Sequence, residues 1–148
     1  MSSVKKYLLP TKLYLWVVVY FILTVLLHWR WQVDIGILIY AIGAVVGAHL
    51  LKFVEATVNM TPSPFRNLVA LIVLTVLTIF VLTSSAMPLG RGVVLFLNLH
   101  FLYIISEEYK QNHDLGSWLP MIPVGNHRTY YFLFWVVFVV ESLLFVLV

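Results

Sequence analysis

Glu141 is a carboxylic acid within an otherwise apolar segment, VVFVVESLLFVLV, and its type and position could support chemistry. A charged carboxylate in the hydrocarbon of a membrane costs at least about 2.5–3.5 kcal/mol, so such a group is either protonated or paired. Ionisable residues inside a membrane are therefore candidates for function. Two structural interpretations stand beside this one: a neutral acid that locks helix packing through a hydrogen bond, or an acid that faces a partner subunit.

Four other polar residues are expected at a depth similar to that of Glu141. A helix rises about 1.5 Å per residue, which places Glu141 and His100 on the order of 10 Å below the same membrane surface. The same count adds Thr24, Tyr40 and Thr78 to this layer. His100 is the best-placed partner for Glu141, and a Glu–His pair can share one proton across the pH range of cells. The layer is typical of a proton-coupled site, with helix packing as the simpler interpretation.

A second polar cluster is expected near the opposite face of the membrane. His49, Lys52 and Glu55 follow one another at i,i+3 spacing, which brings them toward one side of a helix. Glu107 and Glu108 end a later segment at the same face. A pair between Lys52 and either Glu55 or Glu107 would neutralise both charges. Snorkelling with local salt bridges is the simpler interpretation, and a vestibule for an ion or an anionic substrate is the alternative.

A metal site is the main route to enzymatic chemistry in this sequence. His113, Asp114 and His127 supply metal-ligand types in one connector, so a membrane-embedded metal-dependent hydrolase is our third hypothesis. Their spacing matches no strong template, and H-E-x-x-H and G-x-S-x-G are absent from the sequence. Haem would need His49 and His100 to meet across one macrocycle, but their expected depths differ on the order of 10 Å. We therefore predict no cofactor and no metal.

The segment around residues 34–58 contains Gly43 and Gly47, a G-x-x-x-G pair followed at each step by an alanine. Small residues at this spacing let two helices approach closely. The pair predicts packing within the chain first and a dimer face second.

The composition indicates an integral membrane protein. Of the 148 residues, 62% are hydrophobic and only 10% are charged, whereas soluble domains are about half apolar and about a quarter charged. The net charge of +3 comes without a basic run longer than two residues, so we expect no nucleic-acid partner. The chain has no cysteine, which excludes disulfides, iron–sulfur clusters and thiolate zinc sites.

Five segments are expected to span the membrane as helices, in one all-α transmembrane domain over residues 1–148. The expected spans are about 12–31, 34–58, 67–87, 92–106 and 129–148, of which the fourth is short and has polar ends. The connector 107–128 contains LGSWLPMIPV, which is apolar but broken by proline. We expect this connector at the membrane interface, with Trp118 as an anchor.

The basic residues predict an orientation. With the N-terminus inside, seven of the nine lysines and arginines fall on the inner side, and only Arg30 and Arg91 fall outside. Because positive charge is enriched on the cytoplasmic side, we predict a protein with its N-terminus inside and its C-terminus outside.

The leading functional hypothesis is a non-enzymatic subunit, accessory protein or scaffold of a membrane complex. Its expected partners are the lipid bilayer and either further copies of itself or a larger membrane protein. The alternative is a small proton-coupled transporter or channel that uses Glu141 and His100. The expected location is a prokaryotic plasma membrane.

Overall fold

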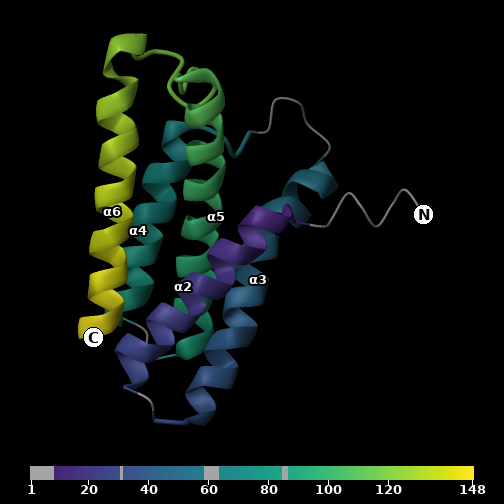
Figure 1. Ribbon diagram of the computed structural model, residues 1–148, viewed down its shortest axis with the longest axis vertical. Coiled ribbons are helices and arrows are strands. Elements are labelled where there is room, and N and C mark those ends of the chain that lie inside the picture. The colour runs from purple at the N-terminus through teal and green to yellow at the C-terminus, as the bar shows by residue number, and fades with distance from the viewer. Residues whose placement is uncertain (1–8, 31, 59–63, 85–86) are drawn as a thin grey trace.

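The computed structural model describes residues 9–30, 32–58, 64–84 and 87–148 (Figure 1). Of these described residues, 83% are helical and none lies in a strand. The helices are α2 (Thr11–Trp29), α3 (Ile35–Val58), α4 (Leu68–Ser84), α5 (Pro88–Asn112) and α6 (His127–Leu147), with a 3-10 turn, η1 (Val124–Asn126), before the last.

Four of these helices are long and apolar enough to cross a membrane: α2, α3, α5 and the continuous segment Val124–Leu147. α4 is apolar but has only 17 residues, a length of about 25 Å against a hydrocarbon core of about 30 Å. The all-helical class is thus confirmed, with four helices that could span a membrane. The count of five spans and the orientation stay predictions.

The expected length of the fourth segment was wrong. We expected a helix over 92–106, but α5 is longer at both ends and covers Pro88–Asn112. Proline suits the first turn of a helix, where its missing N–H would have no intrahelical acceptor. At the other end the polar residues SEEYKQN continue the helix until His113, which closes it in a left-handed conformation with φ 52°. Of the expected connector 107–128, residues 107–112 are therefore helical, as is the start of α6.

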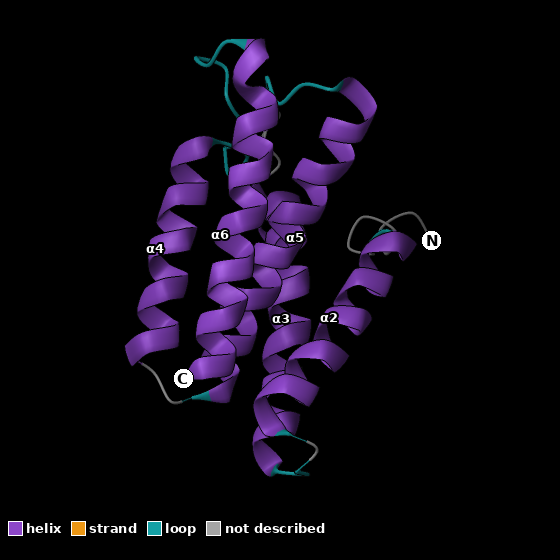
Figure 2. Cartoon of the chain, turned by 60° about the vertical axis from the view of Figure 1, so that its left-hand side comes forward, coloured by secondary structure: helices purple, strands orange, loops and turns teal. Residues whose placement is uncertain are grey.

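α5 is the central helix of the bundle (Figures 1 and 2). It packs against α2, α3, α4 and α6. In an apolar stretch of 18 residues of α5, 72% of the residues are buried, compared with 17% in the corresponding stretch of α2. In Figure 1, α2 crosses in front of α3 and α5, while α4 and α6 lie together on the other side of α5. Polar side chains in the middle of α5, such as His100, are thus placed between helices.

The closest contact in the fold joins α3 to α5. A Cβ added to Gly43 would lie 2.3 Å from the carbonyl oxygen of Leu89, and one added to Gly47 would lie 2.2 Å from that of Val93. Gly92 of α5 is equally tight, with the α3 backbone 2.6 Å from its Cβ position. In the structure the two glycines of the G-x-x-x-G pair pack against α5 of the same chain. Because α5 covers this face, the pair is not free to form a dimer.

The connector between α5 and α6 folds back onto the bundle. Trp118, expected as an exposed interfacial anchor, is instead fully buried. Its ring packs against Phe101, and its indole Nε1 donates a hydrogen bond of 2.9 Å to Glu108. Leu115 and Leu119 are buried beside it in the same apolar cluster. These three side chains of the connector therefore join the core, whereas Met121 and Val124 of the same connector remain exposed.

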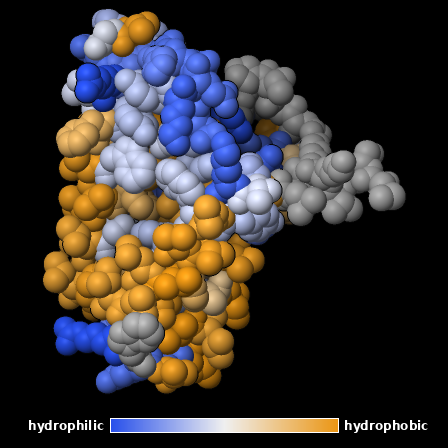
Figure 3. Space-filling view, in the orientation of Figure 1, coloured by the Kyte–Doolittle hydropathy of each residue, from blue (hydrophilic) through white to orange (hydrophobic). Residues whose placement is uncertain are grey.

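The surface divides into an apolar belt and a polar end (Figure 3). The polar end holds the α5–α6 connector, and a narrower polar rim closes the opposite end. Lys5 and Lys6 lie outside the described residues. Of the seven described basic residues, two (Arg30 and Arg91) lie at the ends of helices on the rim side, and five lie at the polar end: Lys12, Lys52, Arg66, Lys110 and Arg128.

Candidate intramembrane binding site

Glu141 is buried within α6 and is hydrogen-bonded to a neighbouring helix. Only 1% of its surface is exposed. Its Oε2 accepts a hydrogen bond of 2.9 Å from Nδ2 of Asn98 on α5. The same amide nitrogen donates at 2.7 Å to Oγ1 of Thr78 on α4. This network joins α4, α5 and α6 at one depth in the bundle.

The direction of each hydrogen bond in this network follows from the Thr78 hydroxyl. That hydroxyl donates to the carbonyl oxygen of Leu74 at 2.8 Å. Its oxygen must therefore accept from Asn98, and this requirement fixes which end of the Asn98 amide is the nitrogen. Both amide protons of Asn98 are then used, one on Thr78 and one on Glu141.

The second carboxyl oxygen of Glu141, Oε1, is buried and has no hydrogen-bond partner among the described residues. A buried polar atom without a partner costs about 1–3 kcal/mol. Such an atom therefore indicates either a strained site or a place for a ligand.

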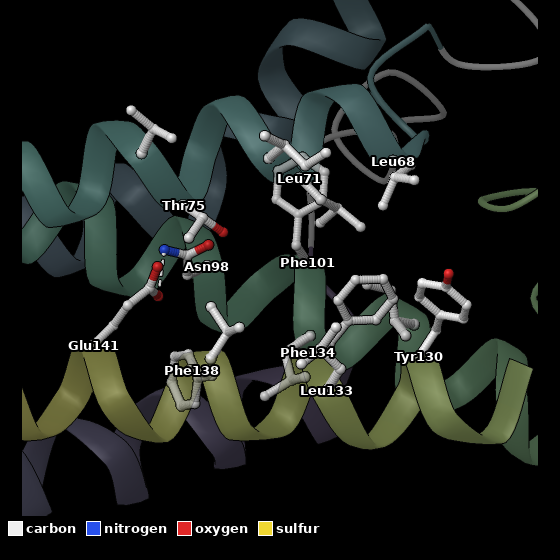
Figure 4. Close-up of a pocket in the computed structure, with 15 residues that line it drawn as sticks. Leu68, Leu71, Thr75, Asn98, Phe101, Tyr130, Leu133, Phe134, Phe138 and Glu141 are labelled. Atoms are coloured by element: carbon white, nitrogen blue, oxygen red, sulfur yellow. Dashed lines mark hydrogen bonds between the residues drawn. The ribbon is translucent and has the colours of Figure 1, made fainter.

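Glu141 and Asn98 form the polar end of a cavity of about 350 Å³ between α4, α5 and α6. Figure 4 shows the cavity as an elongated space that begins at these two residues and ends near Leu68 and Tyr130. Between the two ends the lining is almost entirely aliphatic or aromatic, and Thr75 adds one hydroxyl. A long apolar space with one polar end is suited to an amphiphilic molecule.

The other members of the expected polar layer form a separate network. The Tyr40 hydroxyl donates to Thr24 Oγ1 at 3.0 Å, and Thr24 donates in turn to the backbone of its own helix, α2. A further bond of 2.8 Å joins Tyr20 of α2 to Ser142 of α6. These hydrogen bonds lie within the helix interfaces, which fits the packing interpretation for Thr24 and Tyr40.

The structure does not place His100 as the partner of Glu141. The His100 ring lies against the backbone of Ala48 on α3, and its Nδ1 has no partner among the described residues. His100 and Asn98 are two positions apart on α5, so they point to different sides of that helix. The partner of Glu141 is Asn98, which our reading of the sequence missed. Its signal was present, because Asn98 is the one amide within the apolar run GVVLFLNLHFLYII.

The expected inner cluster separates into local pairs. Glu55 holds Arg66 through two hydrogen bonds, of 2.7 and 3.0 Å, and these bonds raise the pKa of the Arg66 guanidinium. Among the described residues, the ion pairs of Glu107 are with Lys12 at 3.9 Å and Lys110 at 3.6 Å, rather than with Lys52. These surface pairs match the simpler interpretation of the cluster, which needs no ion or substrate.

His49 and Glu108 also make only local contacts. Nδ1 of His49 lies 2.9 Å from the Val45 carbonyl oxygen, and its Nε2 lies 3.3 Å from the Tyr14 hydroxyl. Glu108 accepts hydrogen bonds from Trp118 and Ser117 of the connector. Neither residue points to a shared vestibule.

The metal candidates in the connector do not form a metal site. His127 is buried, with Nδ1 against Asp114 and the Leu115 amide, and Nε2 lies 2.9 Å from the Ile122 carbonyl oxygen. Both of its ring nitrogens thus hold the connector against the start of α6. His113 ends α5 and packs on Tyr109. The described part of the chain contains no group of three or more metal-ligand residues placed to hold an ion.

Comparison with known proteins gives no match to a protein-family model, a curated protein or a solved structure. The function is therefore inferred from the chemistry of the site itself.

Proposed function

We propose that this chain is a multi-pass integral membrane protein that works by binding inside the bilayer, as a non-enzymatic accessory protein or subunit. The observation that supports this function is the cavity of about 350 Å³ that ends on a buried acid with one unpartnered oxygen. An acid of this kind is energetically costly to keep in a membrane. Such a group is therefore a candidate for function.

The occupant we propose for the cavity is a lipid-like molecule that arrives from the bilayer. Ile72 and Val76 of α4 and Leu133 of α6 line the cavity and are also strongly exposed at the surface of the bundle. The cavity is therefore reached from the side of the bundle, where hydrocarbon would surround a membrane protein. In this proposal the chain spans the membrane five times with its N-terminus inside, in a prokaryotic plasma membrane, as the sequence predicts.

The test compares two neighbouring positions on α6. Val137 lines the cavity, whereas Val136 is exposed on the outside of the helix. We expect native mass spectrometry of protein purified from its membrane to detect a bound small molecule on the natural chain and on Val136→Phe. Val137→Phe should lose it, because the larger ring fills the cavity. Equal retention by both variants, or no bound species on any of the three, would contradict the proposal.

A proton-coupled transporter is the second candidate, and the buried acid is the observation that favours it. In this case Glu141 would exchange protons through its own cavity rather than with His100, because its hydrogen-bond partner is Asn98. Proton flux into proteoliposomes that is lost in Glu141→Gln would support transport. The absence of flux with the natural chain would exclude this role for Glu141.

A further inference from the structure

We propose that the occupant of the α4–α6 cavity is a single-chain amphiphile whose head group is a hydroxyl or an amine. This inference rests on the proposed function and specifies its ligand. It is carried by two observations: the hydrogen-bonding character of the polar end and the shape of the apolar remainder.

The polar end of the cavity offers acceptors from the network around Glu141. Both amide protons of Asn98 are used, and the Thr78 hydroxyl proton is donated to its own helix. The oxygen of Asn98 lies on the cavity side of its amide (Figure 4), and Oε1 of Glu141, which is buried beside it, becomes available to a ligand when the carboxyl group turns toward the cavity. A ligand that completes this network must therefore bring a hydrogen-bond donor for the Asn98 oxygen and for an ionised Glu141.

Hydroxyl and amine head groups meet this need in either protonation state of the acid. Each can donate to an ionised carboxylate and can accept from a protonated one. An amine can also take the proton of the acid, so that the carboxyl O–H bond breaks, an N–H bond forms and an ammonium–carboxylate pair remains. An ester or a carboxylate can only accept, so it leaves an ionised Glu141 without a partner.

The shape of the cavity fits one hydrocarbon chain. The residues that line the cavity run along α6 from Tyr130 to Glu141, over which the helix rises on the order of 16 Å. The lining is apolar along this length, which suits an extended hydrocarbon chain.

The buried acid distinguishes this cavity from a purely apolar groove that faces lipid. An acyl chain of the bilayer can fill an apolar groove without any polar contact. It would leave Oε1 of Glu141 buried beside hydrocarbon at a cost of about 1–3 kcal/mol. A ligand with a donor head removes this cost, and we therefore expect selectivity by head group as well as by chain.

The experiment ranks four probes with the same twelve-carbon chain on the full protein in nanodiscs. The probes are dodecylamine, dodecanol, methyl laurate and dodecane, each competing with a photoreactive dodecylamine analogue whose attachment is mapped by mass spectrometry. We expect the amine and the alcohol to compete about tenfold better than the ester, a difference of about 1.4 kcal/mol. We also expect labelling on α4 and α6, and its loss in Val137→Phe but not in Val136→Phe.

Glu141→Gln is the most informative variant because it replaces a hydrogen-bond acceptor at the polar end of the cavity with a donor. A glutamine can accept the Asn98 hydrogen bond through its oxygen and then presents N–H donors to the cavity. We expect this variant to lose its preference for the amine and to gain affinity for the ester. If the variant fails to fold, the ranking of the four probes on the natural chain still tests the inference.

The outcomes separate this inference from the function on which it rests. Equal competition by all four probes would overturn the head-group assignment, while the native species lost in Val137→Phe would still support binding. Competition by the amine alone would overturn the hydroxyl half of the assignment and restrict the ligand to cationic amphiphiles. A natural chain that takes no probe and carries no native species would overturn both.

Discussion

The two sides of α5 are packed in opposite ways. Toward α3 the contact is so close that Gly43 and Gly47 have no room for a methyl group. Toward α4 and α6 the helices leave a cavity of about 350 Å³. The same central helix therefore takes part in one contact with no room for a methyl group and in another interface that holds a cavity.

Side-chain size explains the difference between the two sides. Glycine and alanine on α3 let the backbones of α3 and α5 touch, so the contact stabilises through dispersion without any polar group. Phe134 and Phe138 of α6 and Phe101 of α5 line the open side and hold the helices apart. Small residues thus allow close helix packing on one side. On the other side, large residues leave space for a ligand, and the polar network there contains a carboxyl oxygen without a hydrogen-bond partner.

The largest expected effect is on the tight side. Gly47→Ala should lower the free energy of unfolding by about 1–3 kcal/mol, because its methyl group meets the Val93 carbonyl at 2.2 Å. Gly90→Ala is the matched control, since its Cβ position lies 3.5 Å from the nearest atom, a side-chain carbon of Val81. Thermal unfolding in detergent should separate the two variants. Equal melting temperatures would show that the contact is looser than described.

The second-largest expected loss of stability comes from removing the central residue of the polar network between α4, α5 and α6. Asn98→Ala should cost about 1–2 kcal/mol, because it leaves Oε2 of Glu141 and Oγ1 of Thr78 without their donor. Adding Glu141→Leu in the same chain should restore part of that loss, since no unpaired carboxyl group then remains. Unfolding of the two single variants and the double variant measures this coupling. Strictly additive losses would mean that Asn98 and Glu141 do not interact.

The smallest expected loss of stability is at the ion pair that joins α3 to the start of α4. Arg66, just before α4, donates two hydrogen bonds to Glu55 near the end of α3. Arg66→Lys keeps the charge but loses the two-point geometry, so we expect a loss of about 0.5–1 kcal/mol for this partly exposed pair. Lys110→Arg, at an ordinary surface pair, is the control and should be neutral. The loss at Arg66 should shrink in high salt, and a loss independent of salt would point to packing instead.

The sequence allowed the tight side to be predicted better than the open side. Apolar length predicted five helical segments, four of which are long and apolar enough to span a membrane, and the spacing of Gly43 and Gly47 predicted close packing, because both patterns depend on neighbouring residues only. The partner of Glu141 depends on how α5 is rotated against α6, and depth alone could not choose between Asn98 and His100. The burial of Trp118 was missed for a similar reason, since hydropathy does not tell whether an apolar loop covers lipid or protein.

The most direct test of the binding site observes the Glu141 carboxyl group itself. Infrared difference spectra would be recorded on the protein in nanodiscs before and after addition of dodecylamine, with Glu141→Gln and Val137→Phe as controls. We predict a carboxyl band that changes when the amine binds, with no change in either variant. A carboxyl band unaffected by the amine would contradict the claim that Glu141 closes a ligand site, and would leave it as an acid that only holds α4, α5 and α6 together.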